Sequence, residues 1–493
     1  MLDWYKSFLI YRDIRVIRLL FFGFSSGLPI LLIFSTLSLW LKSAGLDRST
    51  ITLFSWAGLA YSFKFLWAPI IDKLPVIFLT DRFGHRKSWL ILSQLFLIIL
   101  LITVGFIDPK NNLFLMGLTI VCIGFSSATQ DAMVDTYRIE TAPQILQSAM
   151  SGTYIVGYRL GMITAGAGSL ILASWLGGDN EVYNVRAWQK TYMIMALFQS
   201  IGLLCSILSP EPALKRNLIV NLKDRLKLIK VFIISIFGFI FVFNIFPNFD
   251  IDDPMINGLI SMLKFATAFF AMLFIFYIST KTKLIKKSIL IDTFWSPLSN
   301  FIKKYGTMAI IILFIIGFYR VSDIVMGVVA NLFYSDKGYT LNQIATFSKF
   351  WGLIATISGG LIGGVLASKY NNYLILLLGS ILAAITNLLF ALLVILEPKT
   401  TYLISVIIAD NISAGIASVA FVAFLSSLTN INFTTSQYAL FTSLMLFFPK
   451  IIGGYSGSIV DSLGYFNFFV ITALMGLPVI ITKGCHIGKG LRV

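Results

Sequence analysis

The sequence predicts an all-α protein that crosses a membrane many times. Hydrophobic residues make up 57% of the 493 residues, whereas only 12% are charged. A soluble chain of this length needs far more polar side chains to cover its core. Apolar runs close to the length of about 20 residues that a spanning helix needs recur along the whole chain. Because backbone groups in hydrocarbon must bond to one another, we expect these runs to be helices.

Fourteen apolar runs follow one another in an order of six, two and six. They fall at 16–41, 51–71, 89–107, 113–137, 148–176, 190–209, 229–247, 255–280, 306–334, 341–368, 373–396, 401–428, 436–460 and 465–482. A break rich in proline and charge follows the first six runs, and a segment with six lysines, 281–304, precedes the last six. We therefore predict an N-terminal six-helix bundle over 1–209, a central cytoplasmic linker with two extra transmembrane helices over 210–304, and a C-terminal six-helix bundle over 305–493.

Positively charged residues gather in alternate loops. With the N-terminus inside, and with Arg18, Lys190 and Lys230 at the helix ends counted with the adjoining loops, the inside segments hold 25 of the 38 Lys and Arg residues. The outside loops hold seven and the interiors of the predicted helices hold six. Cytoplasmic loops carry such an excess, so the distribution supports fourteen helices with both termini in the cytoplasm. The net charge of +16 is spread over loops rather than gathered in a basic domain, so we expect no nucleic-acid partner. Three cysteines, two of them in apolar runs, indicate neither disulfides nor a metal site, and we expect no cofactor.

The order of six, two and six suggests two related halves, which is the plan of the major facilitator fold. We therefore expect alternating access, in which 1–209 rocks against 305–493 around a site near mid-membrane. The loop after the second predicted helix is strongly basic. We expect it to latch the cytoplasmic side through four charged residues: Asp72, Arg82, Arg86 and Lys87.

Glycines spaced by four residues occur in several runs, for example at Gly23 and Gly27 and at Gly157 and Gly161. This spacing lets two helices approach closely, so we predict tight helix contacts there. The stretch GFSSG at 23–27 also matches the hydrolase elbow pattern G-x-S-x-G. It lies inside an apolar helix with no preceding strand, and no catalytic domain lies outside the membrane. The sequence therefore does not predict an enzyme.

Charged residues inside the predicted helices indicate a solute pathway. The cations are Lys64, Arg159, Lys264, Arg320, Lys349 and Lys450, and the acids are Asp131, Asp135, Asp323 and Asp410. A charge is expensive in lipid, so we expect these side chains to face a protein interior or a wet cavity between the halves. Structural ion pairing is the alternative: Arg320 and Asp323 are three residues apart and can pair locally. It is the favoured interpretation for Lys264, which lies on the extra helices.

Proton coupling needs a group that gains and loses a proton during the cycle. The two histidines, His85 and His486, lie outside the predicted helices, so aspartates must serve. The candidates are Asp131, Asp323 and Asp410. The small surplus of cations over acids in the two halves favours an anionic solute.

Taken together, motifs in both halves resemble those of one family, the AmpG-type muropeptide permeases of the major facilitator superfamily. The matching stretches are GFSSGLP at 23–29, KFLWAPIID at 64–72, SATQDAMVD at 127–135, GYRLG at 157–161, YRVSD at 319–323, GLIATISGG at 352–360, DNISAGIASVAFVAFL at 410–425 and QYAL at 437–440. They occur in the order in which the family has them and cover both six-helix blocks.

The resemblance implies proton-coupled import of an anhydro-muropeptide, a sugar-rich anionic glycopeptide, by a monomer in a bacterial inner membrane. Its carboxylates suit Lys64, Arg159 and Arg320, and its hydroxyls suit the polar side chains of Gln130, Tyr158 and Asn411. The pattern is also similar to that of acetyl-CoA transporters. A transporter of another organic anion, such as a nucleotide or acyl-CoA, is therefore the main alternative, and a non-transporting sensor is a further one.

Overall fold

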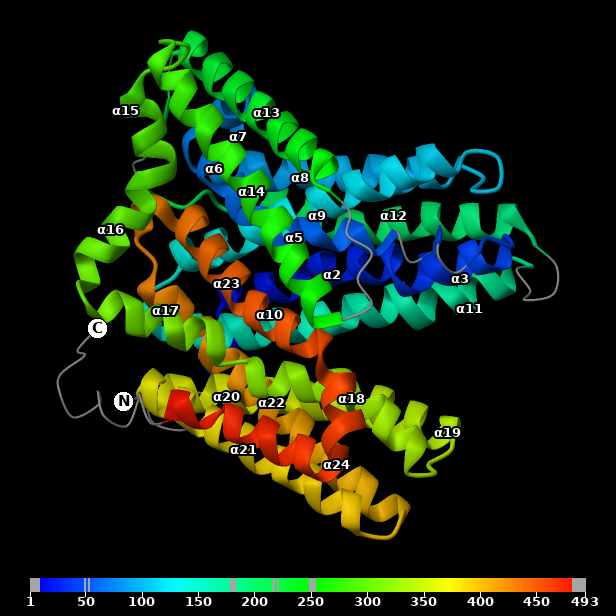
Figure 1. Cartoon of the computed structure of the whole chain (residues 1–493). Helices are drawn as coiled ribbons and strands as arrows, with labels where there is room; N and C mark the ends of the chain where they lie inside the picture. The colour runs from blue at the N-terminus through cyan, green and yellow to red at the C-terminus, as the bar shows by residue number, and fades with distance from the viewer. Residues whose placement is uncertain are drawn as a thin grey trace. The chain divides into compact units, whose positions relative to one another are not determined.

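The computed structural model describes residues 9–47, 50–51, 54–177, 183–214, 218–219, 221–247 and 254–480. These residues form two compact units (Figure 1). Unit 1 holds Met1–Ala68, Val76–Leu214 and Met308–Val493, and unit 2 holds Pro69–Pro75 and Lys215–Thr307. The part of the chain that the structure describes contains helices and no strands, and twelve of its helices are long and apolar enough to cross a membrane. The predicted all-α, multi-pass architecture is confirmed.

The first half of unit 1 is built from helices that follow the first six predicted runs. They are η1 (Ile10–Arg12), α2 (Ile14–Ile33), α3 (Ser35–Ser43), η2 (Phe54–Gly58), α5 (Leu59–Phe63), η3 (Lys64–Leu66), α7 (Leu79–Phe83), α8 (His85–Val104), α9 (Leu113–Thr141), α10 (Gln144–Ile163), η4 (Thr164–Gly168), α11 (Ser169–Trp175) and α12 (Val185–Leu208). The run 51–71 forms short pieces instead of one long helix. Pro69 lies in the first turn of the last piece, α6 (Ala68–Lys73), where its missing N–H is tolerated.

The second half of unit 1 follows the last six predicted runs. Its helices are α17 (Met308–Phe318), α18 (Val321–Asp336), α19 (Leu341–Ile344), η6 (Ala345–Trp351), α20 (Gly352–Lys369), α21 (Asn372–Ile395), α22 (Thr400–Leu428), η7 (Ile431–Phe433), α23 (Thr434–Gly454) and α24 (Ser456–Met475). α23 ends at Gly454, and Tyr455, with φ of −97° and ψ of 0°, joins it to the first part of α24. Gly464, with φ of +77°, then kinks α24.

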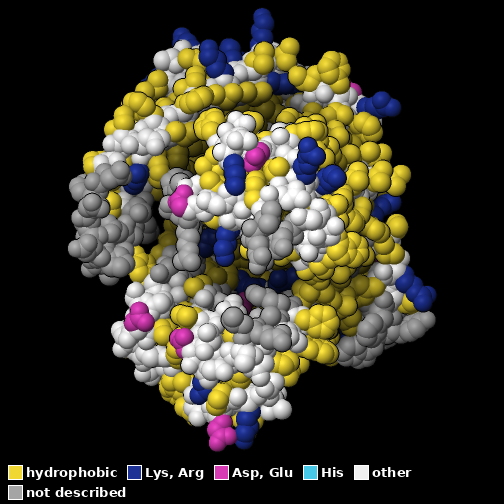
Figure 2. All heavy atoms as spheres, turned by 90° about the vertical axis from the view of Figure 1, so that its right-hand side faces the viewer, with side chains coloured by type: hydrophobic (Ala, Val, Ile, Leu, Met, Phe, Trp, Pro, Cys, Tyr) yellow, Lys and Arg dark blue, Asp and Glu magenta, His cyan; other side chains and the backbone are white. Residues whose placement is uncertain are grey.

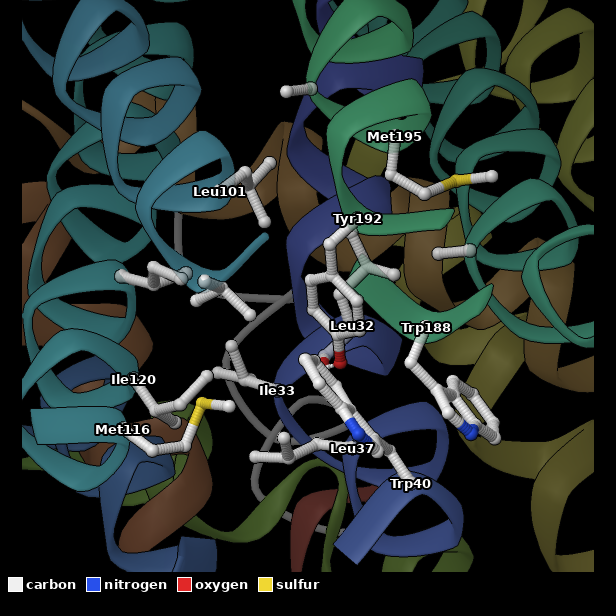
Figure 3. Packing of buried hydrophobic residues seen from close by; sticks show 14 of the residues in the cluster. Leu32, Ile33, Leu37, Trp40, Leu101, Met116, Ile120, Trp188, Tyr192 and Met195 are labelled. Atoms are coloured by element: carbon white, nitrogen blue, oxygen red, sulfur yellow. Dashed lines mark hydrogen bonds between the residues drawn. The ribbon is translucent and has the colours of Figure 1, made fainter. Parts of the chain in front are cut away.

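Aromatic and aliphatic side chains fill the first half between α2, α8, α9 and α12 (Figure 3). Trp40 stacks on Trp188 with ring centroids 6.0 Å apart, and the Tyr192 hydroxyl donates to the Leu32 carbonyl at 2.6 Å. A matching cluster in the second half is centred on Phe333 and Phe469, whose rings meet edge to face at 5.1 Å. Each half therefore has a packed apolar core of its own.

The predicted glycine contacts hold α2 against α10. A Cβ atom on Gly27 would lie 2.0 Å from the Tyr158 carbonyl oxygen, and one on Gly157 would lie 2.0 Å from the Leu20 carbonyl oxygen. Real Cβ atoms do not approach backbone so closely, so only glycine fits at these positions. This packing fixes the part of α10 that carries Tyr158 and Arg159.

Unit 2 is built on a hairpin of α13 (Leu222–Ile245) and α14 (Pro254–Lys281). It continues through α15 (Lys287–Leu290), η5 (Ile291–Trp295) and α16 (Ser296–Tyr305). Lys264, on α14, lies 4.6 Å from the centroid of the Phe243 ring, within the hairpin. This placement agrees with the structural role favoured for that cation.

Candidate functional site

An interrupted helix carries the first of the predicted site residues. α17 ends at Phe318 and α18 begins at Val321, so Arg320 lies at the break. Arg320 Nη2 and Asp323 Oδ2 are 2.5 Å apart, and Arg320 Nη1 donates to the Ser418 hydroxyl of α22. Arg320 Nε is buried and has no hydrogen-bond partner among the described residues. The local ion pair that the spacing predicts is thus present, and the guanidinium keeps capacity for a further acceptor.

The second and third site residues of this half lie on α22. Asp410 interacts with the Thr386 hydroxyl and lies close enough to Asp323 and Arg320 for their charges to act on it. The neighbouring Asn411 accepts a hydrogen bond of 2.8 Å from the Thr356 hydroxyl. Arg320, Asp323, Asp410 and Asn411 are therefore brought to one region of the C-terminal half.

Arg159 faces this region from the other half. Its guanidinium is repelled by Arg320 and attracted by Asp323, so the three charges are close although they come from α10 and α18. Arg159 Nη1 contacts the sulfur of Met162, a weak acceptor, at 3.9 Å. Tyr158 precedes Arg159 on α10 and interacts electrostatically with the carboxylate of Asp131.

A second charged group lies within the N-terminal half. Lys64 is 7% exposed and interacts with the carboxylate of Asp131, which also interacts with the Ser26 hydroxyl. Asp131 Oδ1 is buried without a hydrogen-bond partner among the described residues. The charges that the sequence singles out thus form two groups, one in each half, with Arg159 facing the second.

Gln130 points into the N-terminal half and makes hydrogen bonds there. It is fully buried, its Oε1 accepts from Gln199 Nε2 at 2.7 Å, and its Nε2 donates to the Ser26 hydroxyl at 3.3 Å. Ser26 in turn interacts with Asp131. In this arrangement Gln130 supports the residues around Asp131.

Two further intramembrane cations have distinct positions. Lys450 Nζ of α23 donates to the Ser62 hydroxyl of α5 at 2.8 Å, so this contact also joins the two halves. The side chain of Lys349 lies outside the described residues.

Three of the four predicted gate residues lie in unit 1. Arg86 makes a bidentate ion pair with Glu140 of α9, with atoms 2.8 and 3.1 Å apart, and both side chains are at most 1% exposed. The backbone N–H groups of Arg86 and Lys87, at the start of α8, each donate to the Glu211 carboxylate at 3.0 Å. Lys87 Nζ also donates to a backbone carbonyl of α12. The contacts with Glu140 and with the carbonyl of α12 hold α8 against other helices of the N-terminal half.

The two remaining gate residues differ in exposure. Arg82 is exposed, with its guanidinium carbon 5.4 Å from the centroid of the Phe83 ring. Asp72 is buried and belongs to unit 2.

Arg138, near the end of α9, joins the two halves of unit 1. Its Nη1 donates to the Ser426 hydroxyl of α22 at 2.9 Å, and its Nη2 donates to the Tyr438 hydroxyl of α23 at 3.0 Å. Within its own half it donates to Ser151 at 3.2 Å and pairs with Asp135 at 3.3 Å. The side chain is completely buried. We call this end of unit 1, where α9 ends and α10 and α23 begin, the closed end.

Other contacts support the closure. The Thr136 hydroxyl donates to Thr435 at 3.0 Å, and the Tyr11 hydroxyl donates to the Leu361 carbonyl at 3.1 Å. Figure 2 looks onto the opposite end and shows a hollow between the two halves, with Lys and Arg side chains in its depth. The sequence analysis missed Arg138 because the predicted helix ended at Tyr137. The spacing of Asp135 and Arg138, one helical turn apart, is the signal that indicates it.

Comparison with known proteins agrees with this architecture. The model of the Major Facilitator Superfamily matches residues 19–454. The chain is 31% identical over 469 residues to the candidate transporter AmpG 4 of Rickettsia felis, covering 95% of each chain. It is 27% identical over 474 residues to the anhydromuropeptide permease of Escherichia coli K12, covering 96% of this chain and 79% of that one. It also has the fold of the transporter FucP in the outward conformation, with a TM-score of 0.62, 13% identity and coverage of 96% and 98%.

The chain therefore belongs to the major facilitator superfamily, and within it to the AmpG-type transporters. The fold and the family that the sequence motifs indicate are both confirmed. It is a multi-pass membrane protein of a transporter family.

Proposed function

We propose that this protein imports an anionic anhydro-muropeptide across a bacterial inner membrane together with protons, by alternating access. The observation that carries the proposal is the electrostatic interaction of Arg159 with Arg320 and Asp323, because it links charges from the two halves. The similarity to a named anhydromuropeptide permease supports the choice of substrate.

In this proposal Lys64, Arg159 and Arg320 bind the carboxylates of the substrate. Arginine binds carboxylates through two parallel hydrogen bonds. The buried N–H group at Nε of Arg320 makes no hydrogen bond among the described residues and can donate to such a carboxylate. Tyr158 and Asn411 bind sugar hydroxyls, and Gln130 contributes by holding Ser26 beside Asp131.

Proton coupling follows from competition for Arg320. A substrate carboxylate that reaches this guanidinium displaces Asp323, which then lies beside Asp410 without its counter-charge. Two neighbouring carboxylates in a dry site do not both remain ionised, so a proton enters with the anion. In the N-terminal half, a substrate carboxylate that reaches Lys64 displaces Asp131 from this cation in the same way.

The movement we propose is rocking of 1–209 against 305–493 about this site. The closed end then faces the cytoplasm, as does the basic loop, and both termini are cytoplasmic. The structure corresponds to the state that is open to the outside. Arg138 would hold the cytoplasmic side shut, while Arg86 and Lys87 keep the N-terminal half rigid.

The test is uptake of labelled anhydro-muropeptide by proteoliposomes with and without an inward proton gradient. We expect accumulation that requires the gradient and that a protonophore abolishes. Arg320→Ala should abolish it, whereas Lys42→Ala, at an exposed position of α3, should not. Absence of uptake by folded protein would overturn the proposed substrate.

Another organic anion, such as a nucleotide or acyl-CoA, is the second candidate, because Arg159 and Arg320, with Lys64 in the N-terminal half, suit any polyanion. Competition separates the two. Excess unlabelled anhydro-muropeptide should block uptake of its labelled form, and excess nucleotide or acyl-CoA should not. Accumulation of labelled nucleotide or acyl-CoA that anhydro-muropeptide does not inhibit would favour the second candidate.

A further inference from the structure

Unit 2 exposes lysines at one end of its hairpin and along the segment that follows. α13 begins at this end, α14 ends there, and the segment α15–α16 continues from it. Nine lysines are exposed in these segments: Lys223, Lys227, Lys230, Lys281, Lys283, Lys286, Lys287, Lys303 and Lys304. We call them the lysine surface. The acids beside them are Asp224, which is 3.6 Å from Lys286, and the exposed Asp292. The surface is therefore strongly positive.

Apolar side chains are exposed beside these lysines. Trp295 is 59% exposed and Ile302 is 44% exposed, whereas Phe301 on the other side of α16 is buried. The ring of Phe294 packs on Phe276 of α14 at 4.8 Å, so the segment is anchored to the hairpin. An amphipathic segment with lysines and an exposed tryptophan is typical of helices that lie in a membrane interface.

The course of the chain fits that position. Figure 1 shows that α15 and α16 turn away from the direction of the α13–α14 hairpin. Both hairpin helices have the length and hydropathy of transmembrane helices. When the hairpin spans a bilayer, its lysine-bearing end lies at the membrane surface, and the segment that turns away there begins at the same level.

We propose that the lysine surface binds the head groups of anionic phospholipids in the adjoining leaflet, with Trp295 and Ile302 inserted at the level of the interface. Charge complementarity selects anionic over zwitterionic lipid, since each lysine close to an anionic surface adds to binding. The exposed apolar side chains select a bilayer over a soluble acidic partner, because only the bilayer offers them hydrocarbon. The two extra helices thus serve as a lipid-binding anchor, whatever solute the protein carries.

The test uses the full chain in phosphatidylcholine nanodiscs that contain either brominated phosphatidylglycerol or the same fraction of brominated phosphatidylcholine. Bromine quenches nearby tryptophan, and subtraction of the W295F signal isolates Trp295. We expect stronger quenching by the anionic lipid. The preference should fall as salt is raised, because exposed charges are screened.

Two sets of substitutions make the result specific. K286Q/K287Q/K303Q/K304Q should reduce the anionic preference roughly fivefold or more. The matched control K42Q/K110Q/K190Q removes three exposed lysines of unit 1 and should preserve it. Equal quenching of Trp295 by both lipids, or an equal loss in the control variant, would overturn the proposal.

Discussion

Removal of the Tyr438 hydroxyl should weaken the contact between the two halves at the closed end and favour the open state. Arg138 donates across the halves to Tyr438 at 3.0 Å and to Ser426 at 2.9 Å. A hydrogen bond to a charged group contributes about 1.5–3 kcal/mol net of its exchange with water. Tyr438→Phe removes one such bond from the closed state and retains the aromatic ring over the guanidinium. Because about 1.4 kcal/mol is tenfold in an equilibrium constant, the ratio of closed to open molecules should fall roughly 10- to 150-fold.

The second cross-half bond gives an independent measure. Ser426→Ala should have an effect of similar size. If the two bonds are independent, the double variant should lose about 3–6 kcal/mol of the free energy that favours the closed state over the open state. Ser151→Ala is the matched control, since it removes a hydroxyl that accepts from the same guanidinium at 3.2 Å but within the N-terminal half. This variant should leave the ratio unchanged, because its bond persists in both states.

The assay is a distance measurement between two nitroxide labels at the closed end. Ile145 of α10 and Ala367 of α20 line one cavity of about 290 Å³ from opposite halves, so their separation reports on opening. We expect a longer distance to appear in the Tyr438→Phe and Ser426→Ala proteins and to dominate in the double variant. A distance distribution in the double variant that matches the unmodified chain would refute the role of Arg138 as a latch, as would an equal shift with Ser151→Ala.

Three further outcomes follow from the described contacts. Glu140→Gln removes the charge that forms the bidentate pair with the buried guanidinium of Arg86 and should destabilise the fold by about 3–5 kcal/mol, seen as a lower midpoint in thermal unfolding; an unchanged midpoint would contradict this. Gly27→Ala forces a methyl group against the α10 backbone and should cost about 1–3 kcal/mol, whereas Gly457→Ala, which has open space around it, should be neutral in the same melting assay. Asp131→Asn should abolish gradient-driven accumulation while exchange at equal concentrations continues, and normal concentrative uptake by this variant would remove Asp131 from the proton path.

Hydropathy alone was enough to predict most of the fold. Whether a segment enters the bilayer depends on the summed transfer free energy of about 20 consecutive residues, which is a local property of the sequence. The main departure has a local cause too, because Pro69 lies within the run 51–71 that forms short pieces. The last predicted break, between 460 and 465, coincides with the non-helical Gly464. Because charges inside such segments are costly, the sequence also singled out Arg159, Asp131 and the other intramembrane charges without knowledge of any contact.

The partners of those charges were decided by tertiary structure. Arg159 and Asp323 interact electrostatically although 164 positions separate them along the chain. This interaction depends on the packing of α2 against α10 at glycines and on the packing of the two halves. Arg138 looked like an ordinary loop cation, yet folding buries it completely against Tyr438, 300 positions away. A local pattern shows that a charge must be satisfied, but the group that satisfies it depends on contacts between distant segments. Those contacts exist only once the helices have packed.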